Sequence, residues 1–160
     1  MGEQENKAYW DDFMVGDKRV TAGRTITETD IVNFAGFTGS YDQEHVDREF
    51  AKNTVFGERI GHGLINLCVA EGLRIRTIWY NNDSARGYTL IAFLGLDKLR
   101  YPSPIRIGDT LKSESTILSK RESKKADRGI VVFQDRVINQ RGEVTMECQR
   151  ACMYRRRIGS

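Results

Sequence analysis

The sequence predicts a single α+β domain in which helices lie on one face of an antiparallel sheet. Apolar residues recur at helical spacing in the first half, which also holds the most apolar run of the protein, IGHGLINLCVAEGLRIRTIWY. In the second half, apolar and polar residues nearly alternate over long segments, as in strands with one face on a core. Because an apolar helix needs a sheet to cover it, the strands are expected to wrap around that helix.

Length and composition fit one globular domain. The chain has 160 residues, of which 39% are hydrophobic and 29% charged, enough apolar surface for one core. Residues 1–12 are polar and acidic and are expected to form a flexible lead-in, which leaves residues 13–160 for the folded domain. The net charge of +3 is too small to indicate a nucleic-acid partner, and the basic end YRRRIGS is expected to be a solvated terminus.

The N-terminal half is expected to hold short strands followed by helices. FMVGDKRVTAGRTIT contains a Gly-Asp turn and alternating residues, which predicts short strands. TETDIVNFAGFTG predicts a helix with a capping threonine and an acidic first turn, ended by Gly36 and Gly39. HVDREFAKNTVFG has helical spacing and predicts a second helix that ends before Gly57.

The apolar run at residues 60–80 predicts a third, central helix. Because this run is apolar nearly all round, the helix is expected to be buried. Four strand candidates follow, GYTLIAFLGLDKLRY, TLKSESTILSKRES, GIVVFQDRVINQ and VTMECQRACMYRR. The last two are expected to form a hairpin through QRGE, where the glycine allows the turn.

The three cysteines indicate a reducing environment. Cys68, Cys148 and Cys152 form no CxxC pair and lie far from either histidine, which argues against a disulfide framework and a zinc site. Reduced, mostly buried thiols in a cytoplasmic protein fit this pattern best. The N-terminal stretch lacks the apolar core of a signal peptide, and no apolar run approaches the roughly 18 residues of a membrane helix.

Two histidines are the main candidates for acid–base chemistry. His45 ends the loop GSYDQEH and His62 lies in RIGHGL, both beside glycines and near expected helix starts. Either one alone is typical of a structural, hydrogen-bonded histidine, but both junctions open onto the same apolar helix. A serine hydrolase is disfavoured, because Ser40 lies five residues from His45 without the strained GxSxG turn that marks a nucleophile.

Gly63 is a candidate donor at the start of the apolar helix. The first backbone N–H groups of a helix are unpaired and lie at the positive end of its dipole. A glycine there lets a carbonyl oxygen approach closely, so its N–H can polarise a thioester as in an oxyanion hole. The alternative is that Gly61 and Gly63 only allow a tight helix entry.

Four segments, FMVGD, GRTITETDIVNFAGFTG, IGHGL and PSPIRIGDTL, occur in this order along the chain. Together they resemble the MaoC-like dehydratases, or (R)-specific enoyl-CoA hydratases. The resemblance extends from Phe13 to Tyr154. It implies a single hotdog domain, in which an antiparallel sheet wraps around a long apolar central helix.

In that family the catalytic loop reads Gly-Asp-x-Asn-Pro-x-His, and its aspartate and histidine hold a water that attacks C3 of a trans-2-enoyl-CoA. By resemblance, Gly39 matches the glycine and His45 the histidine. In the His-Gly entry His62 and Gly63 match, and the resemblance implies that the N–H of Gly63 binds the thioester oxygen.

This chain departs from the pattern at the aspartate. Ser40 takes its place, Asp42 stands where the family has asparagine, and Gln43 replaces the proline. A serine cannot serve as a general base near neutral pH, whereas a carboxylate can. Three outcomes follow: Asp42 acts with His45, Ser40 orients a water for His45 alone, or the domain binds an acyl thioester without turning it over. Glu44 is expected to face solvent.

The resemblance implies a hydro-lyase that reversibly hydrates a trans-2-enoyl-CoA, or a related acyl thioester, to a 3-hydroxyacyl-CoA. A non-catalytic acyl-CoA-binding protein is the alternative, followed by an acyl-CoA thioesterase, which rests on fold analogy alone. It also implies a homodimer, or a higher oligomer, with sheets joined edge to edge. No metal or organic cofactor, no nucleic acid and no membrane is expected as a partner.

Overall fold

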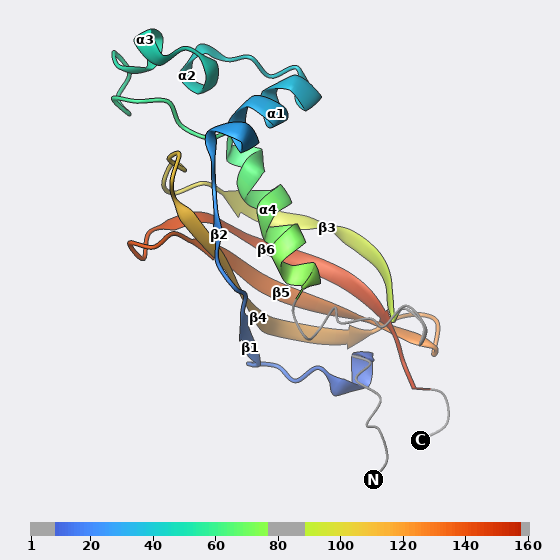
Figure 1. Cartoon of the computed structure of the whole chain (residues 1–160). Coiled ribbons are helices and arrows are strands. Elements are labelled where there is room, and N and C mark those ends of the chain that lie inside the picture. The colour runs from blue at the N-terminus through green and yellow to red at the C-terminus, as the bar shows by residue number, and fades with distance from the viewer. Residues whose placement is uncertain (1–8, 77–88, 158–160) are drawn as a thin grey trace.

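The computed structural model describes residues 9–76 and 89–157 and has the predicted α+β architecture (Figure 1). The antiparallel sheet has the strand order β1-β4-β5-β6-β3, with β2 also paired to β4, and α4 lies across one face of it. The strands are β1 (Lys18–Val20), β2 (Arg24–Thr25), β3 (Leu90–Arg100), β4 (Thr110–Glu122), β5 (Arg128–Ile138) and β6 (Val144–Arg155). The helices are η1 (Trp10–Asp12), α1 (Glu28–Thr38), α2 (Gln43–Val46), α3 (Arg48–Ala51) and α4 (Gly63–Ile75).

The predicted hairpin of the last two strands is confirmed. β5 and β6 pair in register from Arg128 opposite Arg155 to Val137 opposite Met146, and Gly142 in the turn has a φ of 82°. That left-handed backbone favours glycine because a Cβ would clash. The buried residues of β5 and β6 nearly alternate with partly exposed ones, so one face of this hairpin meets the core.

Helix α4 is buried on one side only. Ile65, Val69, Ala70 and Leu73 belong to the core, at the spacing of a single helix face. On the opposite side Leu64, Cys68 and Ile75 are exposed. The prediction of a helix buried all round is therefore wrong for the isolated chain, although the remainder of the apolar run, from residue 77, lies outside the described residues.

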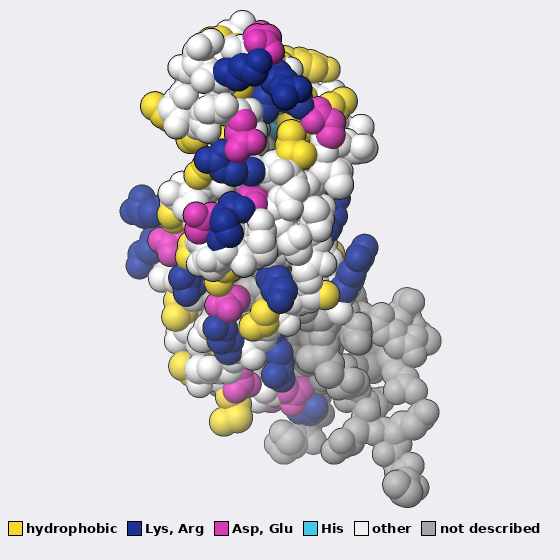
Figure 2. Space-filling model, turned by 60° about the vertical axis from the view of Figure 1, so that its left-hand side comes forward, with side chains coloured by type: hydrophobic (Ala, Val, Ile, Leu, Met, Phe, Trp, Pro, Cys, Tyr) yellow, Lys and Arg dark blue, Asp and Glu magenta, His cyan; other side chains and the backbone are white. Residues whose placement is uncertain are grey.

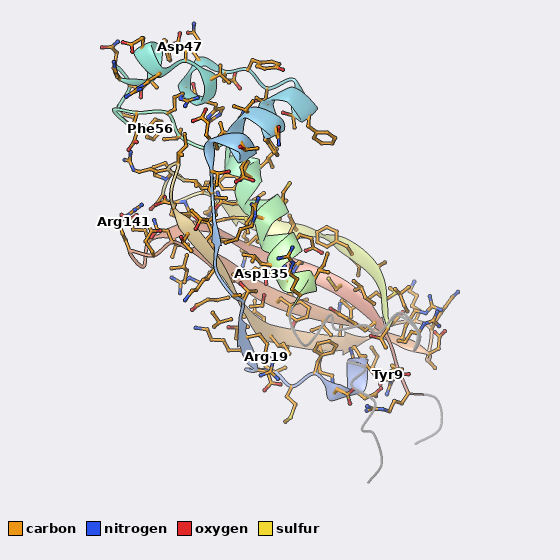
Figure 3. All side chains as sticks on the ribbon, viewed as in Figure 1. Tyr9, Arg19, Asp47, Phe56, Asp135 and Arg141 are labelled. Atoms are coloured by element: carbon orange, nitrogen blue, oxygen red, sulfur yellow. The ribbon has the colours of Figure 1, made fainter. Side chains whose placement is uncertain are left out.

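A buried ionic cluster lies between α4 and the sheet. Asp135 of β5, labelled in Figure 3, is completely buried and accepts hydrogen bonds from Arg150 Nε at 2.5 Å and Ser115 Oγ at 2.6 Å. Arg74 of α4 approaches the same carboxylate at 3.4 Å. Since removing one partner of a buried pair leaves an uncompensated charge, this cluster restricts how α4 sits on β5 and β6.

The segment expected as a flexible lead-in is ordered at its end. Trp10, in η1, is buried and donates a hydrogen bond from Nε1 to the Ile130 carbonyl at 3.1 Å. Trp10 and Phe13 form a second core cluster with residues of β4, β5 and β6, among them Phe133 and Tyr154. Burial of these large aromatic rings ties the chain to the sheet before residue 13. Residues 1–8 lie outside the described residues.

The helical region at the end of the sheet differs from the prediction in two places. Gly36 lies inside α1, and the helix ends at Gly39, which adopts the left-handed conformation with a φ of 74°. The single helix expected after residue 45 is split into α2 and α3. Asp47, labelled in Figure 3, has extended backbone and caps α3 through bonds from Glu49 N and Phe50 N.

The charged side chains of the surface are mixed in sign. On the face shown in Figure 2, lysine and arginine side chains are interspersed with aspartate and glutamate, so this face carries no continuous basic surface. Among residues 9–76 and 89–157, no helix has the length and apolar character needed to cross a membrane.

Candidate functional site

A cavity of about 350 Å³ opens at the N-terminus of α4. It brings together the helical region, the start of α4 and the connection between β3 and β4. Its lining residues are Glu44, His45, Phe56, Ile60, Gly61, Gly63, Asn66, Tyr101, Pro102, Ser103, Pro104 and Ile105. His45 and Gly63, the candidate base and the candidate oxyanion donor, therefore face one space although 18 residues separate them in sequence.

His45 is buried and held in one tautomer. Its Nδ1 lies 2.9 Å from the carbonyl oxygen of Ile60, which can only accept, so Nδ1 carries the proton and donates. The other ring nitrogen, Nε2, then carries the lone pair in the neutral form. Such an imidazole can accept a hydrogen bond from a water or take its proton.

His62 packs against His45, with the two ring planes tilted by 36°. The ring centroids are 3.8 Å apart, and His62 Nε2 donates to the Ser40 carbonyl at 2.9 Å. Its Nδ1 is buried and has no hydrogen-bond partner within the described residues. Burial is the main cause that lowers the pKa of His62, with the neighbouring His45 acting in the same direction, so the neutral ring is favoured. His62 thus supports His45 and the loop but does not line the cavity.

The loop residues Ser40 and Asp42 contact each other outside the cavity. Ser40 Oγ donates to Asp42 Oδ2 at 2.9 Å, and Asp42 is exposed at the start of α2. Gly39 supplies the turn before them. None of these three residues lines the cavity.

Glu44, by contrast, does line the cavity and is half-buried, so the expectation that it faces solvent is wrong. Asn66 and Tyr101 also line the cavity, and neither stands in a sequence motif that would have marked it as a candidate. Only the position of Glu44, immediately before a candidate histidine, could have marked it.

Gly63 provides space at the start of α4. A Cβ at this position would lie 3.3 Å from two ring carbons of Tyr101, which is tighter than an ordinary contact. The glycine therefore keeps the first turn of α4 accessible beside the tyrosine ring, where helix N–H groups lack intrahelical partners. Burial raises the pKa of Tyr101, so its hydroxyl stays protonated near neutral pH.

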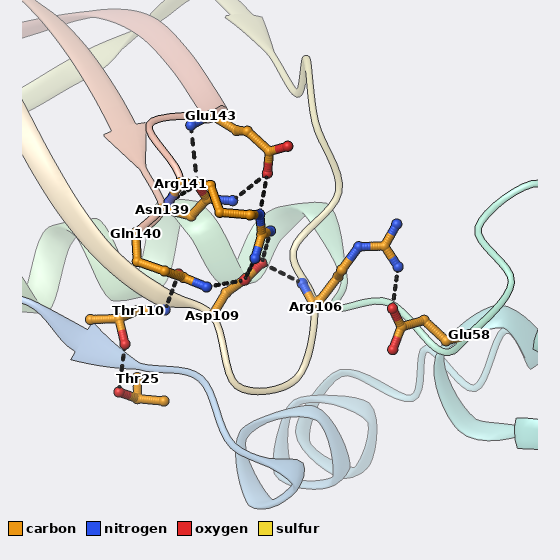
Figure 4. Close-up of polar contacts among 9 residues, drawn as sticks. All are labelled: Thr25, Glu58, Arg106, Asp109, Thr110, Asn139, Gln140, Arg141 and Glu143. Atoms are coloured by element: carbon orange, nitrogen blue, oxygen red, sulfur yellow. Dashed lines mark hydrogen bonds and ion pairs between the residues drawn. The ribbon is translucent and has the colours of Figure 1, made fainter.

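The wall of the cavity is held by a polar network around Asp109 (Figure 4). Asp109 is buried and accepts hydrogen bonds from Arg141 and Gln140 in the β5–β6 turn and from the backbone N–H of Arg106. The Arg106 side chain in turn contacts the Glu58 carboxylate, as Figure 4 shows. It also donates a hydrogen bond to the Phe56 carbonyl. The network joins the loop beneath α3 to the connection that follows β3.

The same wall is fixed by backbone hydrogen bonds. Gly61 N–H donates to the Ile105 carbonyl at 2.8 Å, next to a β-bridge between Ile60 and Arg106. Two segments that are about 45 residues apart in sequence are thereby brought into register at the cavity.

Known proteins of similar sequence support a dehydratase family. The chain is 34% identical to protein MaoC of Klebsiella aerogenes over 122 residues, which is 76% of this chain but 33% of that protein. It is 29% identical to the (R)-specific enoyl-CoA hydratase of Rhodospirillum rubrum over 73% of this chain and 74% of that enzyme. Of the first two curated relatives, protein MaoC and a mycobacterial 3-hydroxyacyl-thioester dehydratase, the chain spans only 33% and 59% of the length.

Solved structures agree with the sequence matches. A monoamine oxidase regulatory protein from Archaeoglobus fulgidus aligns with a TM-score of 0.87 and 33% identity, covering 95% of this chain and 97% of the other. A MaoC-like dehydratase from Rhodospirillum rubrum aligns with a TM-score of 0.81 and 29% identity, covering 95% and 99%. The fold is that of the hotdog proteins. Because residues 12–140 match the MaoC like domain, this chain belongs to the MaoC-like domain family, whose relatives include named hydratases and dehydratases.

Proposed function

We propose that this protein reversibly hydrates a trans-2-enoyl thioester to a 3-hydroxyacyl thioester. The observation that carries the proposal is the shared cavity of His45 and Gly63, in which a neutral imidazole nitrogen can bind water near the N-terminus of α4. The names of relatives point the same way, among them the 3-hydroxybutyryl-CoA dehydratase of Methylorubrum extorquens.

In the proposed reaction the thioester carbonyl lies at the start of α4, where the N–H of Gly63 polarises it. Water held by His45 Nε2 attacks C3, and the electron pair of the double bond moves toward the carbonyl oxygen as an enolate. The proton that the water loses in this step is then delivered to C2, so that one water is added in all. The chemistry uses water and the polarised thioester, so we assign no metal or organic cofactor to it.

The cavity favours a short acyl group as the first substrate to test. Its volume of about 350 Å³ lies at the low end of small-molecule pockets, so crotonyl-CoA is the natural first choice. The pantetheine arm extends out of the cavity in either a CoA or an acyl carrier protein thioester, and both belong in the assay.

Cytoplasmic localisation stays a prediction from the sequence.

We also propose a homodimer joined along β3. This strand is the edge of the sheet, and Phe93 and Leu94 on it are exposed, as are Leu64 and Ile75 of α4. An uncovered apolar edge strand is a ready surface for pairing with a second copy. Sedimentation of the purified chain is expected to give twice the monomer mass, and Phe93→Glu to reduce it; a monomeric wild type would contradict the dimer.

The test of function is turnover of enoyl thioesters by the purified full chain. Turnover is measured as the loss of the absorbance of the conjugated enoyl group. His45→Asn is expected to lower kcat/KM by about 10²–10⁴-fold, because it removes the Nε2 that holds the attacking water. Glu49→Gln on the exposed α3 helix is the control, because its carboxylate lies at the surface and accepts hydrogen bonds from Lys52 Nζ, away from the cavity.

A second candidate function is acyl-thioester binding without turnover. The observation that favours it is Ser40, which stands at the family's aspartate position and donates its hydroxyl to the exposed Asp42. Tight binding of crotonyl-CoA without turnover of any CoA or carrier-protein thioester would support this function and exclude the hydratase. Release of free thiol from an acyl-CoA would instead indicate a thioesterase.

A further inference from the structure

The loop before His45 contains two acidic side chains, and the structure places them differently. Both Asp42 and Glu44 lie near the imidazole pair. Burial is the main cause that lowers the pKa of His62, and the charges of the two carboxylates act in the opposite direction. Proximity to the histidines therefore does not distinguish them. What distinguishes them is the space that each carboxylate faces and the partners it already has.

Asp42 is directed away from the cavity. Its carboxylate is exposed and accepts the hydrogen bond from Ser40 Oγ at 2.9 Å. To reach a water bound at His45, this carboxylate would have to give up that bond. The serine that replaces the family's aspartate thus holds Asp42 at the surface.

Glu44 is the acidic residue among those that line the cavity. It is half-buried, and its carboxylate has no hydrogen bond or ion pair to another described residue, so both oxygens can accept from a ligand. A carboxylate that is partly withdrawn from water is stabilised by a hydrogen-bond donor. A bound water or substrate would supply the missing donor.

One residue fixes Glu44 and His45 together. The N–H of Ile60 donates to the Glu44 carbonyl at 3.2 Å, and the carbonyl of Ile60 accepts from His45 Nδ1 at 2.9 Å. The backbone of the first residue and the ring of the second are thus tied to the same peptide segment. Glu44, His45 and Gly63 line the same cavity in this arrangement.

We propose that Glu44 is the catalytic carboxylate that acts with His45, an assignment that rests on the proposed hydratase function. One hydrogen of the attacking water is accepted by Glu44 and the other by His45 Nε2. As the water oxygen bonds to C3, its proton passes to Glu44, and the electrons of the double bond form the enolate held by Gly63 N–H. The glutamic acid then gives its proton to C2, so one water is added and the carboxylate is restored.

The experiment compares Glu44→Gln, Asp42→Asn and the surface control Glu49→Gln with the wild-type chain on crotonyl-CoA. Glu44→Gln keeps the size and hydrogen-bonding reach of the side chain but removes its basicity. It is expected to lower kcat by about 10²–10⁴-fold with KM within a few-fold. Asp42→Asn is expected to retain most of the activity.

Glu44→Asp is the second variant, in case glutamine disturbs the loop. A shorter carboxylate keeps the basicity of the side chain and is expected to give intermediate activity. Wild-type kcat in Glu44→Gln, or a loss in Asp42→Asn equal to or greater than that in Glu44→Gln, would overturn the assignment to Glu44 while leaving a hydratase. Absence of wild-type turnover on every enoyl thioester would overturn the proposed function and this assignment together.

Discussion

Replacing Asp109 with asparagine is expected to destabilise the fold by about 2–4 kcal/mol. Its Oδ1 accepts from Arg141 Nη1 at 2.7 Å and Gln140 Nε2 at 2.9 Å, and its Oδ2 from Arg106 N at 2.9 Å and Arg141 Nη2 at 3.2 Å. Asparagine keeps one oxygen, so in either orientation its amide faces two donors and two hydrogen bonds are lost. One of them involves an ion pair, which is worth more than a neutral bond.

For a chain of this length, that loss corresponds to a fall in Tm of about 5–15 °C. Thermal unfolding followed by circular dichroism measures it. Asp127→Asn is the matched control, because Asp127 pairs with its neighbour Arg128 at the surface and its loss should leave Tm unchanged. If Asp109→Asn unfolds at the same temperature as Asp127→Asn, the network in Figure 4 does not stabilise the cavity wall.

The stability difference between wild type and Asp109→Asn is also expected to depend on pH. Burial alone would raise the pKa of Asp109, but hydrogen bonds from Arg141, Arg106 and Gln140 outweigh burial and lower it. The stability from this group is therefore fully present above its unfolded-state pKa of about 3.9 and is lost as pH falls through the lower folded-state pKa. The difference in stability between wild type and Asp109→Asn should narrow below about pH 4. A constant difference down to pH 2 would contradict it.

Two further variants address the site. Gly63→Ala keeps the backbone N–H but adds a methyl group 3.3 Å from two ring carbons of Tyr101, where it would hinder the approach of a carbonyl oxygen. We expect kcat/KM to fall by up to about 10²–10³-fold, the range for losing one oxyanion donor, and unaltered kinetics would argue against an oxyanion role. Burial lowers the pKa of His62 in the folded state. As pH falls below about 6.5, the unfolded chain therefore binds a proton at this histidine before the folded chain does, and stability falls until the folded-state pKa is passed. His62→Gln should therefore flatten the urea midpoint between about pH 7 and 5, and an unchanged slope would show that His62 does not carry this dependence.

Local patterns were sufficient for most elements of the fold. The alternation in GIVVFQDRVINQ and VTMECQRACMYRR predicted β5 and β6 with their turn, because one face of each strand must meet the core. Gly39 marked the end of α1, since a left-handed residue there favours glycine. The break at Asp47 was not predicted, because helical spacing of apolar residues continues across a residue whose side chain caps the next helix.

The candidate site was predicted only in part. His45 and Gly63 could be selected because each stands in a short motif at a helix start, and the structure places both at one cavity. The sequence predicted a buried α4, but it did not predict that one side of this helix is exposed in the isolated chain. Apolar residues such as Leu64 and Ile75 have the same character whether a sheet or a second copy covers them.

The sequence by itself determined the family, the order of helices and strands, and the histidine and glycine around which chemistry is proposed. Only the tertiary structure decided which acid faces the cavity. Asp42 and Glu44 are two residues apart, and their direction depends on Ser40 within the loop and on Ile60 from a separate segment. Those contacts exist only once distant parts of the chain have packed together, so no local pattern could encode them.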